Sequence, residues 1–149
     1  MQVYLSHADA DQDLASAIGK VLTEEGLRVW DAGIEVFPGD NYAEVIAKGL
    51  KGSSAMVVLF TPKAIETSLV LKDVDFAIGC QRFAHRLIPV LARDPDDRLL
   101  DQIPWILKRF PLVHLADKEN PRRKIQKVAR DLKQGKGKPR AQKGWNGKP

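Results

Sequence analysis

QVYLSHADADQDLASAIGKVLTEEGLRVWDAGIEVFPGD, residues 2–40, is the stretch of sequence that decides the fold. An apolar run over residues 3–5 ends abruptly in small and polar residues, which predicts a short buried strand. The apolar residues that follow recur at helical spacing: Leu14, Ile18, Val21 and Leu22. Gly26 predicts the end of this helix. Residues 27–30 then read as a second strand, and residues 31–40 as a loop.

The rest of the chain continues the alternation of strands and helices. Further strands are predicted over residues 55–60, 86–91 and 110–115. Apolar stripes of helical spacing cover residues 42–50, 70–78 and 121–132. Because parallel strands need crossover connections, this alternation predicts an α/β fold: a flavodoxin-like five-stranded parallel sheet with helices on both faces.

Size and charge divide the chain into one domain and a tail. The 149 residues, 44% of them hydrophobic, suffice for one domain core and not for two. Residues 1–121 carry 13 Lys and Arg against 18 Asp and Glu, a net charge of −5. Residues 122–149 carry 11 against one, a net charge of +10. We expect a domain over residues 1–133 and a basic, disordered tail over residues 134–149.

Composition also narrows the location and the partners. No apolar run approaches the roughly 20 residues that cross a bilayer, and the first strand begins too early to follow a signal peptide. Cys80 is the only cysteine, so we expect no internal disulfide, no membrane association and a cytoplasmic location. The basic end could bind phosphates, but Trp145 is its only aromatic residue, so we do not expect nucleic acid as a partner.

Several common sites are missing from the sequence. Neither glycine-rich nucleotide fingerprint occurs, and His7, His85 and His114 lack metal-site spacing, so we expect no metal and no bound cofactor. A phosphoacceptor receiver domain would need an acidic pair directly after the first strand, where Asp9 and Asp11 come too late. A nucleoside deoxyribosyltransferase shares the fold, but no motif here matches one.

Three short motifs carry a resemblance to a known family. The first strand ends in Ser6-His7, the second reads Gly-Leu-Arg-Val-Trp-Asp over residues 26–31, and Pro-Gly-Asp over residues 38–40 opens the next helix. This succession resembles a TIR (Toll/interleukin-1 receptor) domain of bacterial type, over residues 2 to about 132. The resemblance implies one of two functions: cleavage of the nicotinamide–ribose bond of NAD, or assembly of signalling complexes.

Ligands of open α/β sheets gather at the carboxyl ends of the strands, where Ser6, His7 and Trp30 stand. Ser6 and His7 are candidates to bind the ribose or phosphate of NAD. In the alternative interpretation, Ser6 shapes the turn and Asp9 forms a capping box with Gln12. Trp30 is a candidate to stack on nicotinamide or adenine, or else is a core residue.

The resemblance implies a catalytic acidic residue in the third helix. Active family members resemble Ser-x-Trp-Val-x-x-Glu, and residues 67–73 here read TSLVLKD. Asp73 therefore takes the catalytic position and Leu69 that of a substrate-binding tryptophan. Cleavage builds positive charge on the ribose carbon, which a fixed carboxylate stabilises. Aspartate is one methylene shorter than glutamate, and the alternative is a solvated helix carboxylate.

The loop after the second strand is a candidate interaction surface. Its members are Ile34, Val36, Phe37, Pro38 and Gly39. Apolar residues in an exposed loop favour a surface that another molecule covers; alternatively they fold back onto the core. Two functions follow from the resemblance. One is a NAD glycohydrolase or ADP-ribose cyclase of a bacterial defence or signalling system, active when self-assembled. The other is a non-catalytic adaptor that binds other TIR domains.

Overall fold

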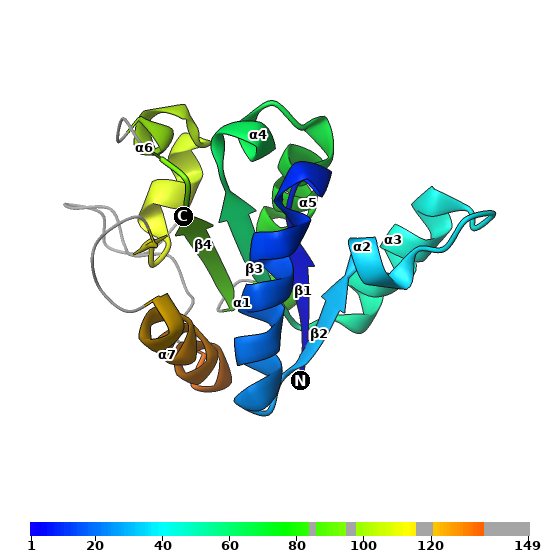
Figure 1. Cartoon of the computed structure of the whole chain (residues 1–149), viewed down its shortest axis with the longest axis horizontal. Helices are drawn as coiled ribbons and strands as arrows, with labels where there is room; N and C mark the ends of the chain where they lie inside the picture. Colours follow the sequence, from blue (N-terminus) through cyan, green and yellow to red (C-terminus); the bar gives the residue numbers. More distant parts are fainter. Residues whose placement is uncertain (84–85, 95–97, 116–120, 136–149) are drawn as a thin grey trace.

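The computed structural model describes residues 1–83, 86–94, 98–115 and 121–135 (Figure 1). Five strands form one sheet: β1 (Gln2–Ser6), β2 (Arg28–Asp31), β3 (Ala55–Phe60), β4 (Leu87–Leu91) and β5 (Val113–His114). The strand order is β2-β1-β3-β4-β5, and every neighbouring pair is parallel. The sheet predicted from the alternation of strands and helices is confirmed.

Helices cover both faces of this sheet. The α-helices are α1 (Gln12–Glu24), α2 (Ala32–Glu35), α3 (Tyr42–Gly52), α4 (Pro62–Ile65), α5 (Ser68–Ile78), α6 (Leu99–Gln102) and α7 (Pro121–Lys133). Three 3-10 helices accompany them: η1 (Asp9–Asp11), η2 (Gln81–Phe83) and η3 (Trp105–Arg109). α1 and α7 lie side by side over one face, whereas α3 and α5 contribute to the core on the other.

Alternation along the strands decides which side chains meet which helices. In β1, Val3 and Leu5 belong to the core cluster under α1 and α7. Tyr4 belongs to the opposite cluster, with Val70 and Val74 of α5. A period of two then places the next polar residue, Ser6, on the α5 side as well. The strand thereby directs its last side chain toward the third helix of the sequence prediction.

Local structure differs from the sequence predictions at four places, the first being the short helix α2 inside the predicted loop over residues 31–40. The predicted strand over residues 110–115 is reduced to the two residues of β5, because Phe110 and Leu112 pack against the core as irregular chain that follows η3. The capping box of Asp9 with Gln12 does not form, since η1 precedes α1 and no side chain caps either helix. The Pro-Gly-Asp motif was expected to open the next helix, but the residue that caps α3 is Asn41, one position after Asp40. Its side chain accepts a hydrogen bond from Glu44 N at 3.2 Å.

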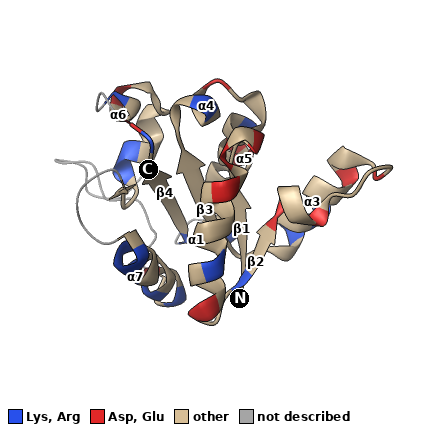
Figure 2. Cartoon of the chain, viewed as in Figure 1, with Lys and Arg blue, Asp and Glu red and all other residues tan. Residues whose placement is uncertain are grey.

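The α2–α3 segment projects from the body of the domain (Figure 1). Lysines and arginines gather on α7, which lies at the opposite end of the molecule from the projecting segment (Figure 2). α7 ends at Lys133, where the sequence places the end of the domain, and residues 136–149 of the predicted tail lie outside the described residues. No helix among the described residues has the length and apolar character to cross a membrane.

Candidate functional site

A small pocket opens at the carboxyl end of β1. Side chains from β1, α3 and α5 line it, together with backbone at the start of α2. Four of the five residues that the sequence assigns to the site line this pocket: Ser6, His7, Leu69 and Asp73. Its volume is about 40 Å³. Ligand pockets start at roughly 300 Å³, so this cavity holds a few water molecules and no nucleotide.

Asp73 reaches into the pocket from α5 and is not a solvated helix carboxylate. Its Oδ2 accepts a hydrogen bond from Ser6 Oγ at 2.9 Å. Burial raises the pKa of Asp73 to about 6, against the opposing influence of hydrogen bonds from Ser6 and Tyr4 and the charge of His7. The hydroxyl of Ser6 therefore serves the carboxyl group and does not cap α1. A partly buried carboxyl with a perturbed pKa in a cleft is the pattern of a functional site.

His7 and Asp31 form a buried hydrogen-bonded pair beside this carboxyl. His7 Nε2 lies 2.7 Å from Asp31 Oδ1, and each side chain is 3% exposed. Gln12 Nε2 donates to Asp31 Oδ2 at 2.9 Å, and Gly33 N donates to Oδ1 at 2.9 Å. Burial acts to raise the pKa of Asp31, but the hydrogen bonds from His7 and Gln12 outweigh it and the pKa is lowered.

Trp30 lies outside the pocket. Its ring stacks on that of Tyr4, with centroids 5.0 Å apart and planes 16° apart. Its other neighbour is the backbone of α3, where a Cβ added at Gly49 would lie 2.4 Å from the indole. Tyr4, which lines the pocket, stands between the indole and the carboxyl of Asp73 in the network of contacts. The structure thus places Trp30 as a core residue, and its stacking on a substrate stays a prediction.

Two exposed apolar side chains stand at the mouth of the pocket. Leu69 on α5 is 44% exposed, and Tyr42 at the start of α3 is 43% exposed. Tyr42 belongs to the helical apolar stripe predicted over residues 42–50, and its place at the pocket was not predicted. The sequence did offer one signal for this role. Tyr42 is the first residue of the helix that follows the loop over residues 31–40, and that loop leaves the carboxyl end of β2.

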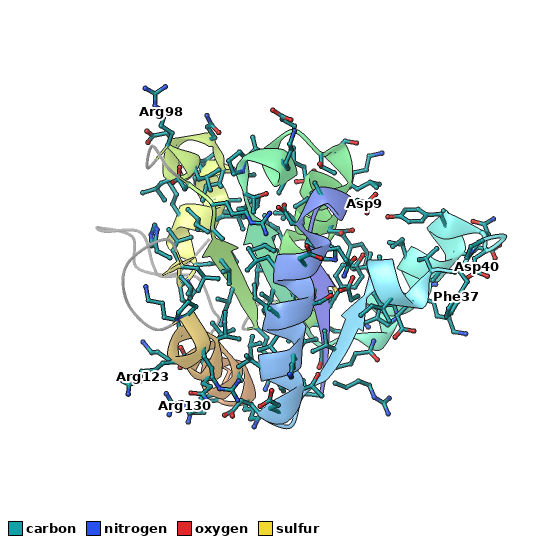
Figure 3. All side chains as sticks on the ribbon, viewed as in Figure 1. Asp9, Phe37, Asp40, Arg98, Arg123 and Arg130 are labelled. Atoms are coloured by element: carbon teal, nitrogen blue, oxygen red, sulfur yellow. The ribbon has the colours of Figure 1, made fainter. Side chains whose placement is uncertain are left out.

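The projecting loop exposes its apolar side chains. Ile34 is 58% and Phe37 64% exposed, so these two do not fold back onto the core, whereas Val36 is half-buried. Figure 3 shows Phe37 and Asp40 at the outer end of the projecting segment. The turn is closed by Asp40, whose carboxylate accepts from Phe37 N at 2.9 Å and whose N–H donates to Phe37 O at 3.0 Å.

A second polar cluster lies at the same edge of the sheet and was not anticipated. The carboxylate of Asp11 is buried and accepts a hydrogen bond from the hydroxyl of Thr61. Arg93 Nη1 lies 3.4 Å from Asp11 Oδ1. Thr61 Oγ1 also accepts from Ala64 N at 3.1 Å and so caps α4. These contacts tie the ends of β3 and β4 to η1, which is a structural role.

No group of three or more His, Cys, Asp and Glu side chains among the described residues could hold a metal ion.

A family model described as "TIR domain" matches residues 3–135. The chain belongs to the TIR domain family. No curated protein matches the chain.

Solved structures with the same fold include two TIR domains and one enzyme. A TIR-STING receptor from C. gigas aligns with 21% identity and a TM-score of 0.68, over 92% of this chain and 39% of that one. The TIR domain of the Toll-related receptor TRR-2 from Hydra magnipapillata aligns with 20% identity and a TM-score of 0.70, over 88% and 97%. A 2-deoxyribosyltransferase from Bacillus psychrosaccharolyticus aligns with 13% identity and a TM-score of 0.59, over 95% and 100%. The chain thus spans less than half of the TIR-STING receptor that it matches.

Proposed function

We propose that this TIR domain cleaves the nicotinamide–ribose bond of NAD when copies of it assemble, as part of a bacterial defence or signalling system. The observation that carries the proposal is the carboxyl of Asp73, held by Ser6 in the pocket at the end of β1. Cleavage of this bond builds positive charge on the ribose carbon. A fixed carboxylate beside that carbon stabilises the charge as it develops.

The protonation state of Asp73 suits this task. With a pKa of about 6, the group is mainly ionised at pH 7.5 and can offer a negative charge to the ribose. Hydrogen bonds from Ser6 and Tyr4 hold the carboxylate in place within the pocket, where ribose hydroxyls would meet it. NAD is the substrate, and no further cofactor takes part.

The size of the pocket explains why assembly is needed. A cavity of about 40 Å³ cannot hold nicotinamide riboside, so Leu69 and Tyr42 at the mouth must separate before NAD binds. The projecting loop supplies the apolar surface for assembly, because Ile34 and Phe37 are exposed in the single chain. Contacts that draw on the α2–α3 segment would also reposition Tyr42, the first residue of α3.

The test is nicotinamide release from NAD over a range of protein concentrations. The rate per molecule should rise as the protein associates, and Asp73→Ala should abolish it with no change in circular dichroism. Asp73→Glu, which restores the longer side chain, should raise it. Asp75→Ala is the matched control, because Asp75 lies on the same helix and is exposed. Equal rates in the wild type and Asp73→Ala would contradict the proposal.

A second function is favoured by the exposed loop alone. An adaptor that only binds other TIR domains would use Ile34 and Phe37 and leave the pocket closed. Chromatography of the products separates the two functions, and also distinguishes linear from cyclic ADP-ribose. An adaptor would associate at high concentration, release no nicotinamide at any concentration, and be indifferent to Asp73→Ala.

A further inference from the structure

Both ring nitrogens of His7 face hydrogen-bond acceptors. Nδ1 lies 2.8 Å from the carbonyl oxygen of Ala8. Because a backbone carbonyl has no proton to give, Nδ1 must carry the hydrogen of that bond. Nε2 lies 2.7 Å from Asp31 Oδ1. The charge of the ring therefore depends on whether the proton of this second bond belongs to His7 or to Asp31.

The surroundings of Asp31 assign that proton to His7. The carboxyl group already accepts from Gln12 Nε2 on one oxygen and from Gly33 N on the other. Hydrogen bonds donated to a carboxyl group favour its ionised form, which has no proton to give. Nε2 must then donate as well, and an imidazole with two N–H groups is a cation.

Charge around the ring points the same way. Asp31 from β2 bonds the ring directly, and Asp9 from η1 and Asp73 from α5 line the same pocket as His7. Tyr4 from β1 and Tyr42 from α3 line the same pocket. Burial by itself lowers the pKa of His7, but the hydrogen bonds to Asp31 and Ala8 outweigh it and the pKa is raised.

We propose that His7 is a positioning residue: an imidazolium, anchored by Asp31 and the carbonyl of Ala8, whose charge keeps the neighbouring Asp73 ionised. This role rests on the proposed function for its use in NAD cleavage, but not for its physical basis. Both N–H groups of His7 are occupied within the protein. The positioning role therefore replaces the direct contact with ribose or phosphate that the sequence suggests for His7.

The two carboxyl groups near His7 relate to it differently, since Asp31 bonds the ring directly and Asp73 does not. Asp73 and Asp31 are both partly or fully buried carboxyl groups at one sheet edge, and one cation lies among them. Asp31 takes the direct ion pair, which holds the ring in place. Asp73 accepts hydrogen bonds from the neutral hydroxyls of Ser6 and Tyr4 and feels the ring through its charge alone, with no hydrogen bond between the two groups in the described part of the chain.

The first experiment reads the charge of His7 without NAD. Nitrogen-15 NMR of the full chain distinguishes an imidazolium, with two equivalent N–H shifts, from either neutral tautomer. We expect the imidazolium pattern for His7 at pH 7.5, assigned by its loss in His7→Gln, with the exposed His114 as the internal comparison. A neutral His7 at pH 7.5 would overturn the proposal.

The second experiment reads the effect on Asp73, which a merely structural role of His7 would not move. In the wild type, the carboxyl carbon of Asp73 should titrate with a midpoint near 6. In His7→Gln, which keeps a donor but loses the charge, the midpoint should move up by about one pH unit. Asp31→Asn is the second variant: it should convert His7 to the neutral form and move the Asp73 midpoint in the same direction. An unchanged Asp73 midpoint in whichever of these variants folds would overturn the proposal.

Activity then separates this inference from the proposed function. If the wild type releases nicotinamide, the acid limb of its pH–rate profile should move up with the Asp73 midpoint in His7→Gln. If no variant cleaves NAD under any condition, the proposed function fails, while the two NMR readings still decide the charge of His7 and its influence on Asp73.

Discussion

The pocket at the end of β1 and the projecting α2–α3 segment depart from ordinary packing in opposite directions. At the pocket the chain buries charge, with His7 and Asp31 almost inaccessible and Asp73 partly so. At the segment it exposes apolar groups, with Ile34 and Phe37 more than half accessible. Buried charge and exposed apolar surface both work against stability. The two features lie next to each other, which is the arrangement that the proposed function requires.

Asp73→Asn breaks the first half of this comparison and has the largest expected effect. Nicotinamide release should fall at least a hundredfold, because the charge that stabilises the ribose cation is lost. The folded state should become more stable at pH 7.5. A pKa raised from 3.8 to about 6 corresponds to a penalty of up to about 3 kcal/mol, which we reduce to about 1–2 kcal/mol for solvent screening.

Thermal unfolding of Asp73→Asn beside Asp75→Asn measures that gain. Asp75 is exposed on the same helix, so its replacement should leave the melting temperature nearly unchanged. A loss of stability in Asp73→Asn would mean that the carboxylate supports the fold. Burial of its charge would then not be a net cost to stability.

Asp31→Ala tests the other buried carboxyl and should act on stability before activity. It leaves His7, Gln12 and Gly33 N without their shared acceptor. Removing one partner of a buried ion pair costs about 3 kcal/mol. Chemical denaturation measures the loss. A cost below about 1 kcal/mol at pH 7 would show that the ion pair is not formed in solution.

The pH dependence of the two carboxyl groups should have opposite signs. Asp73 has a raised pKa, so its penalty to stability is absent near pH 4 and grows as the pH rises to about 6. Asp31 has a lowered pKa, so its ion pair stabilises the fold above the ordinary range of aspartate and is lost as the pH falls through the lowered value. The raised pKa of His7 maintains the pair until the pH rises through that value.

Nicotinamide release should follow Asp73 in the same window. Below pH 6 it should fall about tenfold for each pH unit as the carboxylate is protonated. Measuring nicotinamide release and melting temperature of the wild type and Asp73→Asn from pH 5 to 8 checks the pH dependence of both activity and stability. A pH-independent rate between 5 and 7 would remove Asp73 from the chemistry.

The parts of this molecule that follow from local pattern were predictable, and those that depend on register were not. Period-two and period-3.6 spacing locate the strands and the main helices, and the family resemblance points to Asp73. The pairing of His7 with Asp31 depends on β1 and β2 lying in register, with Leu5 opposite Asp31. Neither strand by itself reveals the register. Once the two strands are known to be neighbours, however, an aspartate at the end of one and Ser-His at the end of the other indicate the pairing.

Aromatic residues show the same limit. Trp30 and Tyr4 are directly opposite in the paired strands, so they stack on each other. Hydrophobic pattern alone left both a core and a substrate-stacking interpretation open for Trp30. It also could not distinguish the irregular, core-packing chain before β5 from a longer strand, because both bury apolar residues.

Phe37→Ala breaks the second half of the comparison. Because the side chain is 64% exposed, its loss should change the melting temperature by less than about 2 °C. Self-association, measured by light scattering, should weaken at least tenfold, and any nicotinamide release with it. Pro38→His should act in the same direction. Val36→Ala is the matched comparison, since Val36 is half-buried on the same loop and should cost stability first. Unchanged association in Phe37→Ala would leave the exposed loop without a partner.

The smallest expected effect is at the basic end of the chain, and a pair of truncations sharpens it. The buried side chains of α7 end at Leu132, and Gly135 N donates to Leu132 O at 3.2 Å. Removing residues 136–149, a segment whose sequence has no apolar pattern, should leave melting temperature and nicotinamide release unchanged. Ending the chain at Asp131 instead removes Leu132, which is fully buried against α1 and the sheet, and should cost about 2–4 kcal/mol. If the longer truncation product, ending at residue 135, also unfolds or loses activity, the boundary of the domain lies beyond residue 135. The basic tail would then be part of the same domain as the pocket and the projecting segment.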